Sequence, residues 1–99
     1  MQIAQVRGTV VGTQKLPSLM GKKFLLLQFL DEDGQPLSGY EVAADPVGAG
    51  VGEWVLVTRG SAARTEADSR DRPLDAMVVA IIDTVNVQDR SIYRKRDHY

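Results

Sequence analysis

The chain has 99 residues, of which 43% are hydrophobic and 25% are charged, a composition typical of one soluble globular domain. Its formal net charge of −1 gives no electrostatic reason to bind nucleic acid or an anionic membrane surface. The absence of cysteine excludes disulfides, thiolate nucleophiles and cysteine zinc sites, and it fits a reducing compartment.

The N-terminal segment gives no reason to expect an export signal. Residues 1–7 lack the layout of a signal peptide. The longest apolar runs, 24–27 and 76–82, are too short to cross a bilayer. We therefore expect a cytoplasmic protein that does not enter a membrane.

Apolar and β-branched residues, separated by turn signals, predict five strands along the chain. Gly8 and Gly12 interrupt the first, and glycine inside a strand often marks a bulge or a bend. The Asp33-Gly34 pair suits a hairpin between the second and third. The last strand is apolar on both faces, so we expect it to be central or covered on both sides. The predicted strands are 2–13, 23–30, 39–44, 53–58 and 76–87.

The remaining segments are polar or rich in small residues. Ser61 suits the N-cap of a short helical turn that runs through Arg64, and 65–72 is wholly polar. Residues 88–99 have no apolar periodicity, so we assign them no secondary structure. We expect a single domain of residues 1–87, followed by a charged C-terminal tail of residues 88–99.

Short strands bent by glycine predict an all-β fold. We expect a small, five-stranded, OB-like antiparallel β-barrel with one short helical turn. Closure of such a barrel removes exposed strand edges, which would otherwise pair with other chains.

The densest group of small residues is the block from Asp45 to Glu53, which includes Gly48, Ala49 and Gly50. The block precedes a predicted strand, whereas a dinucleotide-binding loop must open a helix. Together with the small residues 61–63, it allows two interpretations. The residues form tight turns of a monomer, or they lie at a crowded symmetry axis where several copies meet.

Candidate catalytic residues are scarce. The only histidine, His98, lies near the C-terminus in a polar segment, where an exposed surface residue is the ordinary interpretation. Asp45, Asp75 and Asp83 lie at strand ends, and nothing in the sequence pairs two of them as acid and base. No ligand spacing supports a metal site. We expect no catalytic residue, no cofactor and no metal.

OB-like barrels often bind single-stranded nucleic acid through a basic groove with stacking aromatic side chains. Phe24 and Phe29 are an odd number of residues apart, so on a regular strand they face opposite sides. Trp54 lies in an apolar strand, and basic residues cluster only at 22–23 and in the tail. These observations argue against a nucleic-acid site, so we expect no nucleic-acid partner. A single-strand-binding protein is kept as the alternative function.

Two blocks at a fixed separation identify a family. The first is Asp45-x-Val47-Gly48-Ala49-Gly50, and the second is Gly60-Ser61-x-Ala63-Arg64. With these blocks, the chain resembles the bacterial microcompartment vertex proteins, the CcmL/EutN family. Residues 82–87 and the basic tail favour the carboxysome branch, while Ala62 stands where many members carry a second serine. Further similarity lies in Gly8–Thr13, Lys15, Gly21, Leu25–Leu27, Glu41–Ala44, Glu53, Val55, Val57, Arg72–Ala76 and Ile81–Asp83.

The resemblance implies a cyclic homopentamer of small β-barrels that caps the vertices of the polyhedral carboxysome shell. This role is structural rather than enzymatic, and it supports CO2 concentration and carbon fixation. The implied partners are hexameric shell proteins and an internal scaffold protein, and the vertex of another metabolic microcompartment is the related alternative. The pore and axis candidates are Ser61, Ala62 and Ala63, with Gly48, Ala49 and Gly50 as second choice. The protomer-interface candidates are Glu53, Arg64 and Asp75.

Overall fold

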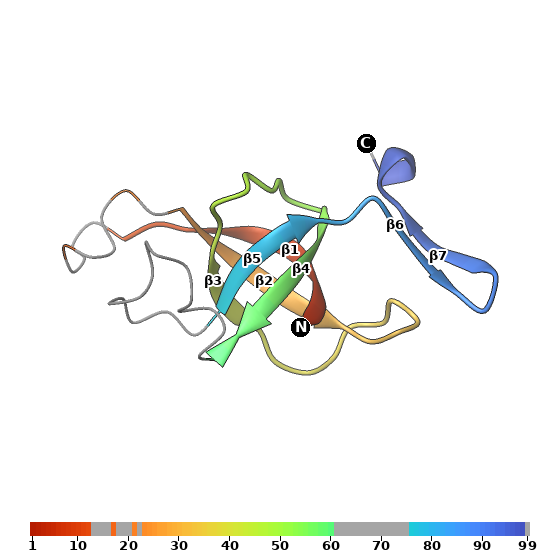
Figure 1. Cartoon of the computed structure of the whole chain (residues 1–99). Helices are drawn as coiled ribbons and strands as arrows, with labels where there is room; N and C mark the ends of the chain where they lie inside the picture. Colours follow the sequence, from red (N-terminus) through yellow and green to blue (C-terminus); the bar gives the residue numbers. More distant parts are fainter. Residues whose placement is uncertain (13–16, 18–20, 22, 61–75, 99) are drawn as a thin grey trace.

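The computed structural model describes residues 1–12, 17, 21, 23–60 and 76–98. The described part is almost entirely β-structure, with one 3-10 helix at Lys95–His98 (Figure 1). Its strands are β1 Gln2–Val10, β2 Phe24–Leu30, β3 Glu41–Ala44, β4 Trp54–Arg59, β5 Ala76–Ile81, β6 Thr84–Val87 and β7 Arg90–Arg94.

Five strands close into a barrel in the order β1-β2-β3-β5-β4, which confirms the predicted fold class. The β1–β2, β2–β3, β4–β5 and β1–β4 pairs are antiparallel. The closing pair, β3–β5, is instead parallel, and its register joins Ala44 to Met77. The expectation of an antiparallel barrel therefore holds for every pair except this closure.

Glycine shapes the barrel at two predicted places. The pairing of β1 with β2 shifts register between Val6 and Gly8, so the predicted bulge is confirmed. Gly34 has a φ of 80° in the turn after β2, and a Cβ there would lie 2.7 Å from a ring carbon of Trp54. Both its backbone conformation and the packing therefore require glycine.

Alternation along the strands fills the barrel with small and aliphatic side chains. Residues such as Ala4, Val6, Leu25 and Leu27 are fully or almost fully buried, while their neighbours in sequence face outward. The core consists of Ala4, Val6, Leu25, Leu27, Phe29, Ala43, Ala49, Val55, Val57, Ala76 and Val78.

The prediction of one continuous last strand was wrong. Pairing with β4 ends where the Ile82 N–H donates to the Trp54 carbonyl at 2.9 Å. After Asp83 the chain leaves the barrel as β6 and pairs with β7 (Figure 1). Residues 76–87 therefore supply two strands to two different sheets.

The segment for which we predicted no secondary structure forms β7 and the 3-10 helix. Its hairpin packs on the barrel through a second small core. Tyr93 stacks on Trp54, with ring centroids 4.3 Å apart and an angle of 14° between the planes. The expected boundary between 1–87 and 88–99 falls in the turn of this hairpin. This second core contains Leu30, Trp54 and Tyr93, with Ile3, Ile82, Val85 and Ile92 against them.

Candidate functional site

The glycine-rich loop 45–53 is built around one buried carboxylate. The Asp45 side chain is 0% exposed. Its Oδ1 accepts hydrogen bonds from the N–H groups of Val47 and Gly48, both at 3.0 Å, and its Oδ2 accepts one from Ala49 at 2.7 Å. The Lys23 ammonium lies 3.5 Å from Oδ2 and donates to the Ala49 carbonyl at 3.0 Å. The loop is therefore held in one conformation by hydrogen bonds to its own backbone.

The three central residues of this loop have different reasons to be small. Gly48 has a φ of 93°, which disfavours any side chain. Ala49 is 2% exposed and belongs to the barrel core. At Gly50, a Cβ would lie 3.2 Å from Glu53 Oε1. Of these three residues, Gly48 and Gly50 are exposed and Ala49 is buried. The place of the three at a symmetry axis stays a prediction.

Glu53 joins the glycine-rich loop to the C-terminal segment. Its Oε1 accepts the Gly50 N–H at 2.6 Å, and its Oε2 lies 3.1 Å from the Lys95 ammonium. The Glu53 carbonyl accepts the Val6 N–H at 2.9 Å, which ties the loop to β1. The carboxylate predicted for a protomer interface is thus bound within its own chain, and the interface assignment stays a prediction.

These contacts predict a pH-dependent stability. The Gly50 N–H lowers the pKa of Glu53, partial burial opposes this, and Lys95 lowers it further. A lowered pKa in the folded state gives stability that is fully present above the unfolded value of about 4.3. That stability is lost as the pH falls through the lower folded value.

We expect Glu53→Gln to melt a few degrees below the wild type at pH 7, because glutamine keeps an acceptor for Gly50 but loses the ion pair with Lys95. The difference should shrink as the pH falls from 5 to 3. Thermal unfolding at fixed protein concentration measures both. Glu32→Gln is the control, since Glu32 is exposed and makes no ion pair with the described residues. A constant difference at every pH would contradict the assigned role of the Glu53 charge.

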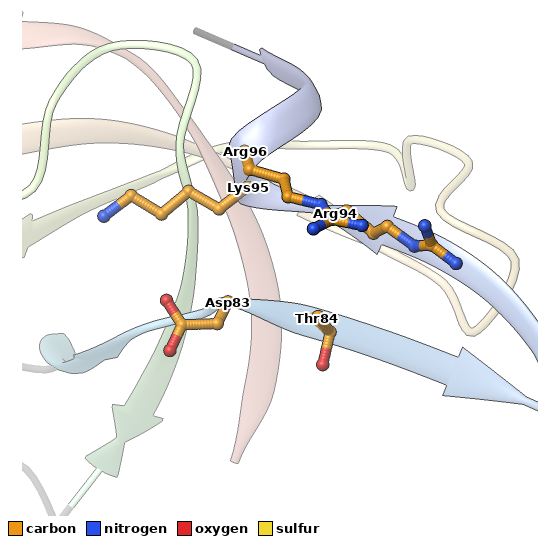
Figure 2. A pocket seen from close by; sticks show the side chains of 5 residues that line it. All are labelled: Asp83, Thr84, Arg94, Lys95 and Arg96. Atoms are coloured by element: carbon orange, nitrogen blue, oxygen red, sulfur yellow. The ribbon is translucent and has the colours of Figure 1, made fainter.

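A basic groove of about 380 Å³ lies where β6 begins and β7 ends. In Figure 2, the Lys95 side chain extends away from the two arginines, and the Asp83 carboxylate lies on the same side as its ammonium. The Lys95 N–H donates to the Asp83 carbonyl at 2.8 Å, which joins the residue before β6 to the residue after β7. Neither Lys95 nor Tyr93 belongs to a periodic pattern in the sequence, so neither was predicted as a site residue. The groove is lined by Asp83, Thr84, Arg94, Lys95 and Arg96.

The remaining predicted site residues belong to a segment that the structure does not describe. Ser61, Ala62, Ala63, Arg64 and Asp75, together with the predicted helical turn, lie outside the described residues. Among the residues that the structure does describe, no group of three His, Cys, Asp or Glu side chains is placed to hold a metal ion. In the same part of the chain, no helix is long and apolar enough to cross a membrane.

Comparison with known families and sequences gives consistent matches. Residues 1–83 match the family described as "Ethanolamine utilisation protein EutN/carboxysome". The carboxysome shell vertex protein CcmL of Synechococcus elongatus is 67% identical over 98 residues, which is 99% of each chain. The microcompartment shell vertex protein PduN of Salmonella typhimurium is 50% identical and covers 87% of this chain and 99% of its own.

Solved structures agree with the sequence matches. The structure of CcmL from Gloeobacter violaceus superposes with a TM-score of 0.92 at 65% identity and covers 98% of this chain and 100% of its own. The GrpN pentameric microcompartment shell protein from Rhodospirillum rubrum superposes with a TM-score of 0.79 at 45% identity, over 88% of this chain and 99% of its own.

Proposed function

The chain belongs to the EutN/CcmL family, and from this membership we infer that it is a structural vertex protein of the carboxysome shell. Its place is the shell of the carboxysome, where it supports CO2 concentration and carbon fixation. The observation that carries this conclusion is full-length identity of 60% to 68% to five carboxysome vertex proteins. The vertex proteins of two other microcompartments are only 50% and 38% identical, so the alternative compartment has less support.

The vertex role requires a ring of five copies, as the pentameric relative indicates. Hexagonal tiles alone form a flat layer, and a closed shell needs pentagons at its corners. In a cyclic ring, one face of each copy meets a different face of the next. A closed barrel, whose loop 45–53 is bound by hydrogen bonds to Asp45 and Glu53, supports such a ring. Hexameric shell proteins and an internal scaffold protein are the further partners of this proposal.

Two features of the described residues support the structural role, one against catalysis and one against nucleic-acid binding. The carboxylates of Asp45 and Glu53 are engaged by backbone N–H groups and lysines of the same chain. Trp54 and Tyr93 are 9% and 2% exposed, so their rings are not available to stack on nucleic-acid bases. Single-strand binding therefore stays the weaker alternative.

Native mass spectrometry tests the proposed assembly. We expect a species of five times the 10.9 kDa chain at micromolar concentration. A monomer or dimer across the micromolar range would contradict the vertex role. Titration with an oligonucleotide at two salt concentrations tests the alternative, because nucleic-acid binding weakens steeply as salt rises. We expect no binding at either concentration.

A further inference from the structure

The C-terminal hairpin is an addition to the domain that the family shares. The family match ends at residue 83, and β6 begins at Thr84. The barrel closes through β1 to β5 alone, while β6 and β7 form a sheet of their own. The exposed side chains of this sheet are all polar or charged, and they are Thr84, Asn86, Arg90, Ser91 and Arg94. The exposed side of the hairpin is therefore a polar surface that the barrel does not need for its closure.

Arg94, at the end of β7, has most of its hydrogen-bond donors unused. The side chain is exposed, its Nε donates to Ser91 Oγ at 3.2 Å, and it makes no ion pair with the described residues. A guanidinium carries five N–H donors in a planar fork. Within the described part of the chain, its two terminal amino groups are thus left without an acceptor. Such a fork matches the two oxygens of a carboxylate.

Arg96 adds a second charge to the basic groove. Its Nε lies 4.0 Å from the Asp97 carboxylate, and the two side chains are 78% and 61% exposed, so water weakens this pair. Lys95 differs, because its ammonium lies 3.1 Å from Glu53 and is neutralised there. In Figure 2 both arginine side chains extend in the direction opposite to Lys95. The groove therefore has an arginine end with available charge and a lysine end without it.

Asp83 restricts where an anion can bind in this groove. Its carboxylate is exposed and lies on the same side as the Lys95 ammonium (Figure 2). A second carboxylate placed beside it would be repelled, because like charges at short distance oppose each other. An anionic ligand is therefore directed to the arginine end.

The polar lining favours a peptide over a small molecule. Small-molecule pockets are mostly apolar and bury most of their ligand. This groove has a volume of about 380 Å³, its lining side chains are all polar or charged, and both arginines are exposed. A single small anion would be held weakly by exposed charges. A peptide would also contact the polar side chains beside the groove, such as Asn86 and Ser91.

We propose that the basic groove binds an acidic peptide segment of another protein, with carboxylates of the peptide on Arg94 and Arg96. Charge complementarity identifies this partner. The whole chain has a net charge of −1, so the attraction is local to the groove. The contact goes beyond the vertex function and does not depend on it, because every residue that it uses lies in one chain.

Fluorescein-labelled hexaglutamate is the probe for the first test. We expect the full chain to raise its fluorescence anisotropy at low salt and to release it as salt rises. Arg94→Gln should raise the Kd roughly tenfold, since it removes one charge-assisted pair. Arg94→Lys keeps the charge without the fork, so its Kd should lie between those of wild type and Arg94→Gln.

Arg90→Gln is the matched control, because it makes the same charge change on the same strand. Arg90 pairs with Asp33 at 3.4 Å and does not line the groove. We expect its Kd to stay close to that of the wild type. Equal weakening by Arg90→Gln and Arg94→Gln would overturn the proposal, because binding would then follow the total charge of the hairpin rather than the groove.

Asp83→Asn should act in the opposite direction. Removing the carboxylate from the groove removes a repulsion between exposed charges, so we expect binding to tighten roughly two- to fivefold. A residue that only stabilised the fold would not tighten binding when replaced. Unchanged or weaker binding of hexaglutamate to Asp83→Asn would contradict the assigned site.

Hydrogen exchange of the wild type gives a second test that needs no substitution. We expect hexaglutamate to slow the exchange of amides in residues 84–96 and to leave β1 and β2 unchanged. Protection elsewhere, or no binding at low salt, would overturn the proposal. Displacement of hexaglutamate by inorganic phosphate at the same concentration would show that a free anion is the ligand, which also overturns it. Native mass spectrometry of the same sample gives the subunit count, so a failure of the vertex function is seen separately.

Discussion

Replacing Asp45 by alanine is expected to lower the free energy of unfolding by about 3 kcal/mol. The change leaves three backbone N–H groups of the loop 45–53 without their acceptor, and hydrogen bonds to a charged group contribute about 1.5–3 kcal/mol each without adding fully. For a chain of this length, such a loss lowers the melting temperature by about 12–24 °C. Lys23 contributes less, because it is 47% exposed and water screens its charge.

Asp31→Ala is the matched control for this experiment. Asp31 Oδ1 accepts the N–H groups of Asp33 and Gln35, both at 2.9 Å, so the chemistry is the same but the site is solvent-accessible. We expect a loss of about 1 kcal/mol or less. Both variants must be compared at one protein concentration, since assembly also raises the apparent stability. Equal losses at the two positions would show that the burial of Asp45 contributes nothing.

The barrel could be predicted from the sequence because its signals are local. Alternation in β1 and β4, glycine at the bulge and Asp33-Gly34 in the turn each point to the observed structure. Closure through the parallel β3–β5 pair could not be predicted in this way, since its register links Ala44 with Met77 across a long stretch of sequence.

The C-terminal hairpin was missed for a physical reason. Its two turn residues, Gln88 and Asp89, both have positive φ values of 50° and 63°, where a hairpin turn usually has asparagine and glycine. A register shift between Val85 and Asn86 also breaks the alternation along the paired strands. The packing of Tyr93 on Trp54 decides the structure, and no pattern within residues 88–99 reveals that contact.

The candidate site was only partly predictable. The small residues of the loop 45–53 stand out in the sequence, but small size alone does not distinguish a backbone requirement from an intersubunit contact. The structure separates these causes for three residues: Gly48 by its φ, Ala49 by its burial and Gly50 by its contact with Glu53. Glu53 could not be assigned from sequence, because its partner Lys95 is 42 positions away, beyond any local pattern.

Replacing Tyr93 by alanine is expected to release the β6–β7 hairpin while the barrel stays folded. Tyr93 is 2% exposed and stacks on Trp54. Its hydroxyl accepts a hydrogen bond from the backbone N–H of Trp54 at 3.3 Å. Truncating a buried aromatic side chain costs about 3–5 kcal/mol. An isolated two-stranded hairpin is only marginally stable in water. We therefore expect the lost free energy to exceed the free energy that holds the hairpin on the barrel.

Hydrogen exchange measured residue by residue distinguishes local release from global unfolding. In Tyr93→Ala, we expect amides of β6 and β7 to lose protection at least tenfold more than those of β1 and β2. Trp54 is the only tryptophan, so its emission should shift to longer wavelength as the stacking ring is lost. Tyr93→Phe keeps the stack and removes only the hydroxyl, and it should cost about 1 kcal/mol and keep the hairpin protected. If β1 and β2 lose protection as much as β6 and β7, the hairpin and the barrel unfold as one unit, and the aromatic stack does not act as a separate anchor.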